Sequence, residues 1–580
     1  MTWQIRTRIP SRGSPAGSSL APPLAAPWRC GHNALVGTDG QDSHDAKGEQ
    51  EHFFGAAKLV AALTMLSRVL GLVRDMVLVP MGGPIVADAF WTAFGIPHLF
   101  RRLFGEGALS AAFIPVFTEA GETAGWDRAR RVLANTAGVL AVVLTGLVVT
   151  IEIGLAVWLL AAPGESKRQL TLQFTMLMLP FTFFICMLAL ASAALNSKRH
   201  FAYPAAAPIL LNVGLIVFGY WLAPVLGRND VEQLRIIGIG VVLCSVGQFL
   251  GAVWLLRRTQ LAARWTLRPI LPEVKQIARR MAPTVVPLGL VQLSDLFARL
   301  IALACTAGAG SPHLPLKPGV IRCHYAAGRL YQLPLGVLAI SIATAVFPLF
   351  SRYAARDDKL RLRGAINRAL RLCLFLGIPA GAGLFVLAEP TIGQIFERGG
   401  FSPLQDTPRT AVMLQMYCLG LPAYFCVHIL LRAFFARKDT RTPMITAAIL
   451  AVLNVLLVLG GIFTPLRSAA LGLATAVTGT VNAFVLAWVL HRQVGRLGGR
   501  KLLASAARVM AAATVMAAAV LGSREALDWL GCGRLVIILA GVVVGALAFA
   551  GAAWGFRCPE LGELRRRPAS QRDGDSDTMA

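Results

Sequence analysis

Five arginines lie within stretches of this sequence that are otherwise apolar enough to cross a membrane. Arg68 and Arg74 share the first stretch, Arg101 and Arg102 the second, and Arg329 lies in the eighth. An arginine at the centre of a membrane helix costs about 2.5 to 3.5 kcal/mol, so five facing lipid would cost on the order of 10 to 17 kcal/mol. Because a typical domain is stable by only about 5 to 15 kcal/mol, these side chains must face water or one another.

The composition is that of a membrane protein. Of the 580 residues, 56% are hydrophobic and only 15% are charged, whereas an ordinary soluble domain has about 25% charged residues. The net charge of +26 would suit a nucleic-acid partner. However, the basic residues form short clusters between apolar stretches, as topology signals do, so we expect no nucleic acid to bind.

Windows of about 20 mainly apolar residues predict an all-α polytopic membrane protein with about fourteen transmembrane helices. The predicted spans cover residues 59–80, 85–117, 133–162, 170–195, 204–225, 234–256, 281–306, 323–350, 369–388, 411–435, 443–464, 468–490, 503–522 and 534–556. The first, second and eighth spans are weak by hydropathy because they carry charges. We interpret them as helices that line a wet cavity, where bent or broken helices are also tolerated.

Lysine and arginine are concentrated in the loops that follow even-numbered spans, above all between Arg257 and Arg280 and between Arg352 and Arg371. Cytoplasmic loops are enriched in these residues, so both termini are predicted to be cytoplasmic. The polar segments at the two ends, residues 1–52 and 558–580, are predicted to be disordered.

Two pairs of segments suggest an internal repeat. The second span ends in FIPVFT (residues 113–118) and the eighth in VFPLFS (346–351). The ends of the fourth and tenth spans share a basic turn followed by proline, NSKR with Pro204 and RKDT with Pro443. Six spans separate the members of each pair, which predicts two halves of equal orientation with the substrate site between them.

The charged residues of the first two spans lie on single helix faces. At about 100° per residue, one face of the first span carries Thr64, Ser67, Arg68, Gly71, Arg74 and Asp75. One face of the second carries Asp88, Gly95, Arg102 and Glu106, flanked by His98 and Arg101. Guanidinium groups outnumber the carboxylates, and such a surplus suits a phosphate or pyrophosphate. The competing interpretation is that these arginines only join helices through buried ion pairs.

Several motifs resemble those of the MurJ (MviN) lipid II flippases, within the multidrug/oligosaccharidyl-lipid/polysaccharide (MOP) exporter superfamily. They are SRVLGLVRD (67–75), ADAF (87–90), PHLFRRLFGEG (97–107), RLYQLPLGV (329–337), FERGGF (396–401) and DTRTP (439–443). The resemblance implies a V-shaped, MATE-like pair of six-helix lobes, residues 56–257 and 258–495. Two further helices in 496–557 would form a lipid-tail groove, between an N-terminal extension (1–55) and a C-terminal tail (558–580).

The resemblance also implies a function. Such proteins carry lipid II, an undecaprenyl-pyrophosphate-linked disaccharide peptide, across the bacterial inner membrane by alternating access. It implies membrane lipids and the peptidoglycan synthesis machinery as partners. Carried over by position, the substrate would meet Arg68, Arg74, Arg101, Arg102 and Arg329, supported by Ser67, Asp88, His98 and Glu106, with Asp75 as an ion-pair partner.

The chain departs from this pattern in three places. His98 stands where relatives often have asparagine, Gly328 where they often have a polar or acidic residue, and the segment 311–319 is longer and richer in proline. Some relatives are thought to bind a monovalent cation, which the membrane potential could replace as a driving force. Asp295, Asn454 and Thr475 are the mid-span candidates here, although helix–helix hydrogen bonds would explain each equally.

Two other functional classes stay open at this point. Another MOP exporter, for O-antigen, polysaccharide or drugs, would share the fold. A membrane enzyme would need a nucleotide loop, paired catalytic acids or a metal cluster, and the sequence offers no such motif. The ten cysteines form no C-x-x-C pair, so neither a zinc site nor a disulfide framework is indicated. We therefore expect a transporter without a catalytic residue, metal or cofactor.

Overall fold

The computed structural model describes residues 39–101, 109–161, 166–308 and 311–565. The chain divides into two units, residues 1–57 and 58–580. In the first unit the described part is the beginning of helix α1 (Asp39–Leu78). The second unit is helical wherever it is described, apart from isolated β-bridges between Thr306 and Leu316 and between Gly308 and Ser311. The predicted all-α class is thus confirmed for the described residues.

The helices of the N-terminal half, which we define as residues 58–258, are α1 from Lys58 onward, α2 (Pro84–Phe100), α3 (Leu109–Ala124), α4 (Trp126–Ala161), α5 (Ser166–Met178), α6 (Phe181–Ser197), α7 (Ala202–Val217), η2 (Phe218–Leu222), α8 (Ala223–Leu226) and α9 (Asp230–Arg258). The helices of the C-terminal half, residues 272–494, are α10 (Pro272–Ala304), α11 (Val320–Pro334), η3 (Leu335–Ala339), α12 (Ile340–Ala355), α13 (Lys359–Val386), α14 (Ala388–Phe396), α15 (Asp406–Ala436), α16 (Arg441–Ile462) and α17 (Ala469–Val494). They are followed by α18 (Gly499–Trp529), α19 (Arg534–Gly555) and α20 (Pro559–Arg565).

Among the described residues, 11 helical stretches are long and apolar enough to cross a membrane. They match the third to sixth and the eighth to fourteenth predicted spans. The first, second and seventh predicted spans coincide with α1, with α2 and α3, and with α10. The expectation that the eighth span is weak by hydropathy is wrong, because its apolar C-terminal part, η3 and α12, outweighs the charges of α11. Large exposed side chains such as Leu539 and Val543 of α19 form surfaces that suit lipid rather than water.

The eighth span contains a turn of irregular helix. α11 ends at Pro334 and passes directly into the π-helix η3 before α12 begins. Proline has no N–H to donate and crowds the preceding turn, which explains the irregular turn that follows it. In the second span, α2 and α3 contain Pro97 and Pro115 respectively, and residues 102–108 between them lie outside the described residues.

The proposed repeat of basic turns has a structural counterpart. α6 ends at Ser197 and α15 at Ala436, and in each case the second residue beyond the end has a positive φ, 60° at Arg199 and 62° at Lys438. In DTRTP, Asp439 then accepts hydrogen bonds from the backbone N–H (3.0 Å) and hydroxyl (2.7 Å) of Thr442 at the start of α16. This motif therefore fixes the beginning of a helix.

The predicted disordered ends require two corrections. α1 begins at Asp39, so part of the segment 1–55 is helical; the glutamate, glutamine, lysine and alanine residues of this part favour helix. The tail from Cys558 continues as α20, whose buried Glu560 accepts hydrogen bonds from Arg371 and Ser505, each at 2.6 Å. Residues 1–38 and 566–580 lie outside the described residues.

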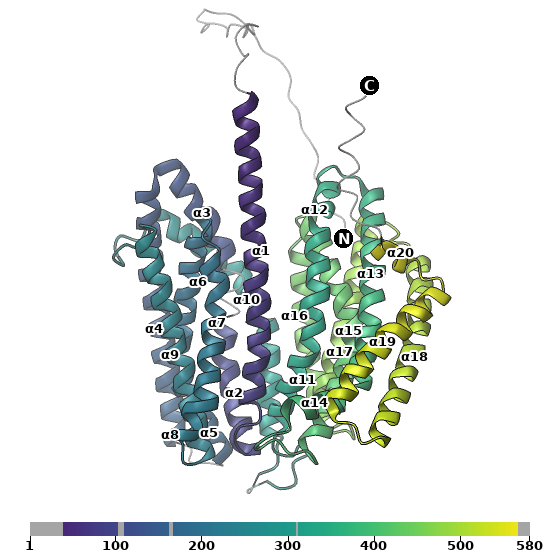
Figure 1. Cartoon of the computed structure of the whole chain (residues 1–580). Helices are drawn as coiled ribbons and strands as arrows, with labels where there is room; N and C mark the ends of the chain where they lie inside the picture. The colour runs from purple at the N-terminus through teal and green to yellow at the C-terminus, as the bar shows by residue number, and fades with distance from the viewer. Residues whose placement is uncertain (1–38, 102–108, 162–165, 309–310, 566–580) are drawn as a thin grey trace, which may run out of the picture. The chain divides into compact units, whose positions relative to one another are not determined.

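The two halves meet through a small set of helices. α2 contacts α10 and α11, and α3 contacts α10. α18 and α19 pack against each other and next to α13 (Figure 1). The charged residues of α1, α2 and α11 therefore belong to the junction between the halves.

Candidate functional site

Two of the five arginines meet at one carboxylate. Arg74 donates to Asp75 Oδ1 from Nε (3.0 Å) and Nη2 (2.6 Å), while Nε of Arg329 lies 3.3 Å from Asp75 Oδ2. Arg74 and Asp75 are buried, whereas the Arg329 side chain is 35% exposed. Helix α1 of one half is thus bound to α11 of the other, and two guanidinium groups share one negative charge.

Tyr325 completes this cluster. Its hydroxyl donates to Asp75 Oδ1 (3.1 Å) and accepts hydrogen bonds from Arg329 Nη2 (2.8 Å) and Arg74 Nη2 (3.3 Å). Trp91 of α2 stacks on the Tyr325 ring with the ring centroids 3.9 Å apart. The guanidinium carbon of Arg329 lies over the Tyr325 ring, 4.8 Å from the ring centroid. Aromatic packing from α2 therefore holds the hydroxyl between both cations.

Asn212 of α7 supports the cluster from the N-terminal half. Its Oδ1 accepts a hydrogen bond from Arg74 Nη1 (3.0 Å), and its Nδ2 donates to the backbone carbonyl of Ser67 (2.9 Å). Ser67 thus lies at the cluster, mainly through its backbone. Sequence reasoning missed Asn212, although a lone asparagine within an apolar span is itself a sign of a buried polar contact.

The remaining arginines are distributed more widely. A guanidinium nitrogen of Arg68 lies 2.6 Å from the point where a Cβ on Gly336 would be, so a residue without a side chain gives it room. Arg68 is half-buried and makes no hydrogen bond or ion pair with the described residues. Arg101 is half-buried at the end of α2. Arg102 and Glu106 lie outside the described residues. The structure brings Arg74 and Arg329 together and places Arg68 against the same bent span.

Asp88 and His98 have other surroundings than expected. Asp88 Oδ2 accepts from the backbone N–H of Gly319 (2.8 Å), and Oδ1 accepts from those of Ile321 (2.9 Å) and Arg322 (3.0 Å). It therefore caps the N-terminus of α11 rather than joining the arginine cluster. The ring of His98 packs between Phe94 and Phe181, with centroid distances of 4.3 and 5.2 Å.

Next to this cap, an arginine that forms a buried ion pair within the C-terminal half also contacts the N-terminal half. Arg322 is fully buried; its Nη2 donates to Asp406 Oδ2 (2.6 Å) and to the Gly400 carbonyl (3.0 Å), and its Nη1 donates to the Gly82 carbonyl (3.0 Å). Gly400 also donates its N–H to the Pro80 carbonyl at 2.8 Å. We call Arg322, Asp406 and these glycine carbonyls the latch.

The latch explains part of the FERGGF motif. A Cβ on Gly400 would lie 2.4 Å from the Gly82 carbonyl oxygen, so the two backbones approach as closely as glycine permits. Gly399 has a φ of +50°, a conformation that other residues rarely adopt. Arg322 directly precedes the predicted span 323–350, and the sequence analysis did not predict its burial.

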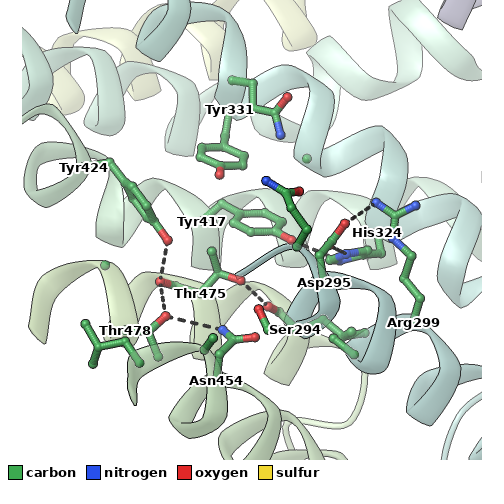
Figure 2. A pocket seen from close by; sticks show the side chains of 18 of the residues that line it. Ser294, Asp295, Arg299, His324, Tyr331, Tyr417, Tyr424, Asn454, Thr475 and Thr478 are labelled. Atoms are coloured by element: carbon green, nitrogen blue, oxygen red, sulfur yellow. Dashed lines mark hydrogen bonds and ion pairs between the residues drawn. The ribbon is translucent and has the colours of Figure 1, made fainter. Parts of the chain in front are cut away.

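A polar chamber of about 340 Å³ adjoins the arginine cluster. It lies between α10, α11, α15, α16 and α17, and Arg329 and Tyr325 form part of its wall. Within it Asp295 binds Arg299 at 2.8 Å, and His324 Nε2 lies 3.7 Å from the same carboxylate, as Figure 2 shows. The other ring nitrogen of His324 is 3.0 Å from the Tyr417 hydroxyl.

The three candidates for a cation site line this chamber, but their described contacts are within the protein. Asp295 carries Arg299 as its counter-ion. Asn454 Nδ2 donates to the Thr478 hydroxyl across two helices at 3.3 Å, and the Thr475 hydroxyl donates to the Leu471 carbonyl at 3.1 Å. The described residues contain no group of three or more histidine, cysteine, aspartate or glutamate side chains that could hold a metal ion.

Comparison with known proteins gives a consistent result. Residues 79–541 match the family model "Lipid II flippase MurJ". The chain is 34% identical over 532 residues to "Probable lipid II flippase MurJ" of Rhizobium meliloti (strain 1021), covering 87% of this chain and 94% of the relative. It is 31% identical over 546 residues to the protein of the same name from Bdellovibrio bacteriovorus (strain ATCC 15356 / DSM 50701 / NCIMB 9529 / HD100), covering 90% of this chain and 99% of the relative.

Two solved structures share the fold. One is described as "Lipid II flippase MurJ, inward closed conformation", with a TM-score of 0.67, 23% identity and coverage of 88% of this chain and 100% of the other. The second is an inward-facing multidrug resistance MATE family transporter of the MOP superfamily. It has a TM-score of 0.60 and 16% identity, and the match covers 76% of this chain and 99% of the other.

Proposed function

The chain belongs to the MurJ family of lipid II flippases, and from this premise we propose that it flips lipid II across the bacterial inner membrane through a site built around Asp75. It is a multi-pass membrane protein with 11 helical stretches able to span the bilayer in its described part. The observation that carries the proposal is that Arg74 and Arg329, from opposite halves of the chain, share one carboxylate. That arrangement leaves positive charge at the junction, where a diphosphate can be bound.

The diphosphate of the substrate would compete with Asp75 for the guanidinium groups. Arginine binds phosphate oxygens bidentately, and hydrogen bonds to charged groups contribute about 1.5 to 3 kcal/mol each. Arg329 is the cation best placed to exchange Asp75 for a phosphate, because its side chain is the more exposed of the two. Flipping breaks and forms no covalent bond, so the proposal requires no catalytic residue.

Alternating access accounts for the remaining features. We propose fourteen spans, with residues 56–257 and 258–495 as two lobes that rock against each other and 496–557 as the lipid-tail groove. Under the orientation predicted from the basic loops, both termini are cytoplasmic and the latch closes the periplasmic end. The latch joins segments that follow the first, seventh and ninth spans, which supports this assignment.

Another exporter of the MOP superfamily would share this architecture. The likeness to the MATE transporter, at 16% identity, concerns the fold alone. Relatives named as lipid II flippases cover nearly the whole chain at up to 34% identity, and no described contact favours the alternative.

Depletion of the chain from its host tests the function. Without it, lipid II should accumulate in the cytoplasmic leaflet, because no other route past the apolar bilayer is open to its charged head. A leaflet-resolved assay of the lipid-linked precursor measures this directly, and expression of the wild-type chain should restore periplasmic exposure. Unchanged leaflet distribution after depletion would contradict the proposed function.

We further propose that the membrane potential drives the return of the empty, positively charged site. Moving one elementary charge through 100 mV is worth about 2.3 kcal/mol, so a site with one excess charge would respond strongly. Collapsing the potential with an ionophore in vesicles should therefore slow flipping severalfold. Flipping that proceeds at the same rate after both the potential and cation gradients are removed would reject this coupling.

A further inference from the structure

Helix α14 packs against α19 and leads directly into the latch (Figure 1). In its first turn, Glu389 accepts a hydrogen bond from Arg524 of α18 at 2.8 Å. At its other end, Glu397 forms an ion pair with Arg534, the first residue of α19. A short helix that is anchored at both ends moves as one rigid element, so a displacement of the pair α18–α19 is passed on through α14.

The contact between α14 and α19 has a defined geometry. A guanidinium nitrogen of Arg534 lies 2.7 Å from the point where a Cβ on Gly393 would be, so glycine at this position gives the arginine room. The Glu397 side chain is only 12% exposed, whereas that of Arg534 is 48% exposed. The second carboxylate oxygen of Glu397 accepts a hydrogen bond from the Thr407 hydroxyl at 2.7 Å. Glu397 therefore connects α19 with the start of α15.

The residues that follow Glu397 belong to the latch. Gly400, three residues later in the FERGGF motif, donates its N–H to the Pro80 carbonyl of the N-terminal half at 2.8 Å. Its own carbonyl accepts a hydrogen bond from Arg322 at 3.0 Å. The motif thus contacts α19 through the Glu397 side chain and the N-terminal half through the Gly400 backbone. A change at the first contact reaches the second within four residues of chain.

Helix α19 has few other attachments to the described chain. It packs mainly against α18 and α14, and only slightly against α13 and α20. Large apolar side chains such as Leu547 cover its exposed surface. Under the proposed function α18 and α19 line the groove for the lipid tail. An apolar chain that enters this groove therefore displaces α19 more easily than α18, which packs closely against α13.

We propose that α14 is a lever through which a polyprenyl chain bound at α18–α19 opens the latch. With the groove empty, the pair of Arg534 and Glu397 holds the FERGGF segment where Gly400 can bond to Pro80, which favours the closed state. A bound chain favours the state in which α19 is displaced, the pair is broken and the segment leaves the N-terminal half. The inference rests on the proposed function, because it takes α18–α19 as the tail groove.

Spin labels across the latch measure this coupling on the purified full chain in lipid nanodiscs. Arg228→Cys and Leu404→Cys place the labels at exposed positions on opposite halves, in a background without accessible cysteines. Undecaprenol is the probe, since it has a long apolar chain but no diphosphate that could bind the arginine cluster. In the wild type, undecaprenol should raise the open fraction roughly threefold, the effect expected from the loss of one half-exposed ion pair.

Matched variants test whether the ion pair carries the coupling. Arg534→Met should raise the open fraction roughly threefold without a ligand and remove the response to undecaprenol. Glu397→Gln should do the same, because it keeps an acceptor for Thr407 but loses the charge, and the double variant should add nothing further. Arg534→Lys keeps a cation and should respond as the wild type does. The control Arg500→Met removes an exposed arginine at the other end of the helix pair and should change neither value.

Three results would overturn the lever. They are a wild-type open fraction in Arg534→Met, a response to undecaprenol that persists in this variant, or an equal opening of the latch in Arg500→Met. A latch that ignores undecaprenol, although depletion of the chain traps lipid II, rejects the lever alone. A latch that responds to undecaprenol, although depletion leaves lipid II where it was, rejects the proposed function and keeps the lever.

Discussion

Replacing Arg322 by methionine should open the end of the protein that the latch holds closed. The substitution removes three donated hydrogen bonds and leaves the Asp406 carboxylate buried without its cation. Of these three bonds, only the one to Gly82 crosses to the N-terminal half, and a hydrogen bond from a charged group contributes about 1.5 to 3 kcal/mol. Two transporter conformations commonly differ by a few kcal/mol, so this loss is large enough to make the open state predominate.

The distance between spin labels across this end measures the change. Arg228→Cys, just before α9, and Leu404→Cys, in the segment before α15, place labels on opposite halves, in a background without accessible cysteines. Both positions are exposed, so labelling should not disturb the latch. Double electron–electron resonance should give mainly the short distance of the closed state in the wild type. In Arg322→Met it should give mainly a longer distance.

The controls distinguish opening from general damage. Arg398→Met removes a charge from an exposed position near the latch and should leave the distance distribution unchanged. The double variant Arg322→Met with Asp406→Leu removes both charges, and such replacement is often nearly neutral, so the unfolding temperature should recover. The distance should stay long, because the hydrogen bond to Gly82 is still missing. A single variant that remains closed, with an unfolding temperature equal to the wild type, would contradict the latch.

The latch also shows where sequence reasoning reaches its limit. Hydropathy predicted the 11 helical stretches of the described residues that are able to cross a membrane, because the cost of burying polar groups in lipid is a local property of each stretch. Arg322 lies just outside the predicted span 323–350, so hydropathy gave no sign of its burial. Its burial depends on Asp406 and on carbonyls of Gly82 and Gly400, which are distant in the sequence, and no local pattern reports such a partner.

The candidate site was likewise only partly predictable from the sequence. The cost of burying arginine predicted that Arg74 and Arg329 face water or other polar groups, and the structure places both at the Asp75 carboxylate. Helix periodicity could not identify Tyr325 and Asn212 as their partners, because a helical face does not specify the helix that it meets. It also grouped Asp88 with the arginines of its own span, whereas its carboxylate caps a helix of the other half.

The largest effect on transport should come from Arg329→Ala. Its guanidinium is the half-exposed partner of a carboxylate that Arg74 already neutralises, so its charge is the one most available to a diphosphate. Losing one charge-assisted, bidentate contact removes about 1.5 to 3 kcal/mol, equivalent to roughly 10- to 100-fold in binding. We therefore expect depleted cells that express Arg329→Ala to keep lipid II in the cytoplasmic leaflet, with at least a tenfold lower rate of exposure.

Comparison of substitutions then shows whether charge or geometry matters. Arg329→Lys keeps the charge but loses the planar donor pair, so it should restore flipping only in part. Arg74→Ala and Arg68→Ala should also impair flipping, whereas Arg356→Ala, which removes an exposed loop cation, should not. Full rescue by the alanine variants of Arg68, Arg74 and Arg329 would reject the assignment of the diphosphate site even if depletion confirmed transport. Partial rescue by lysine would instead show that the site needs the oriented donors of arginine as well as its positive charge.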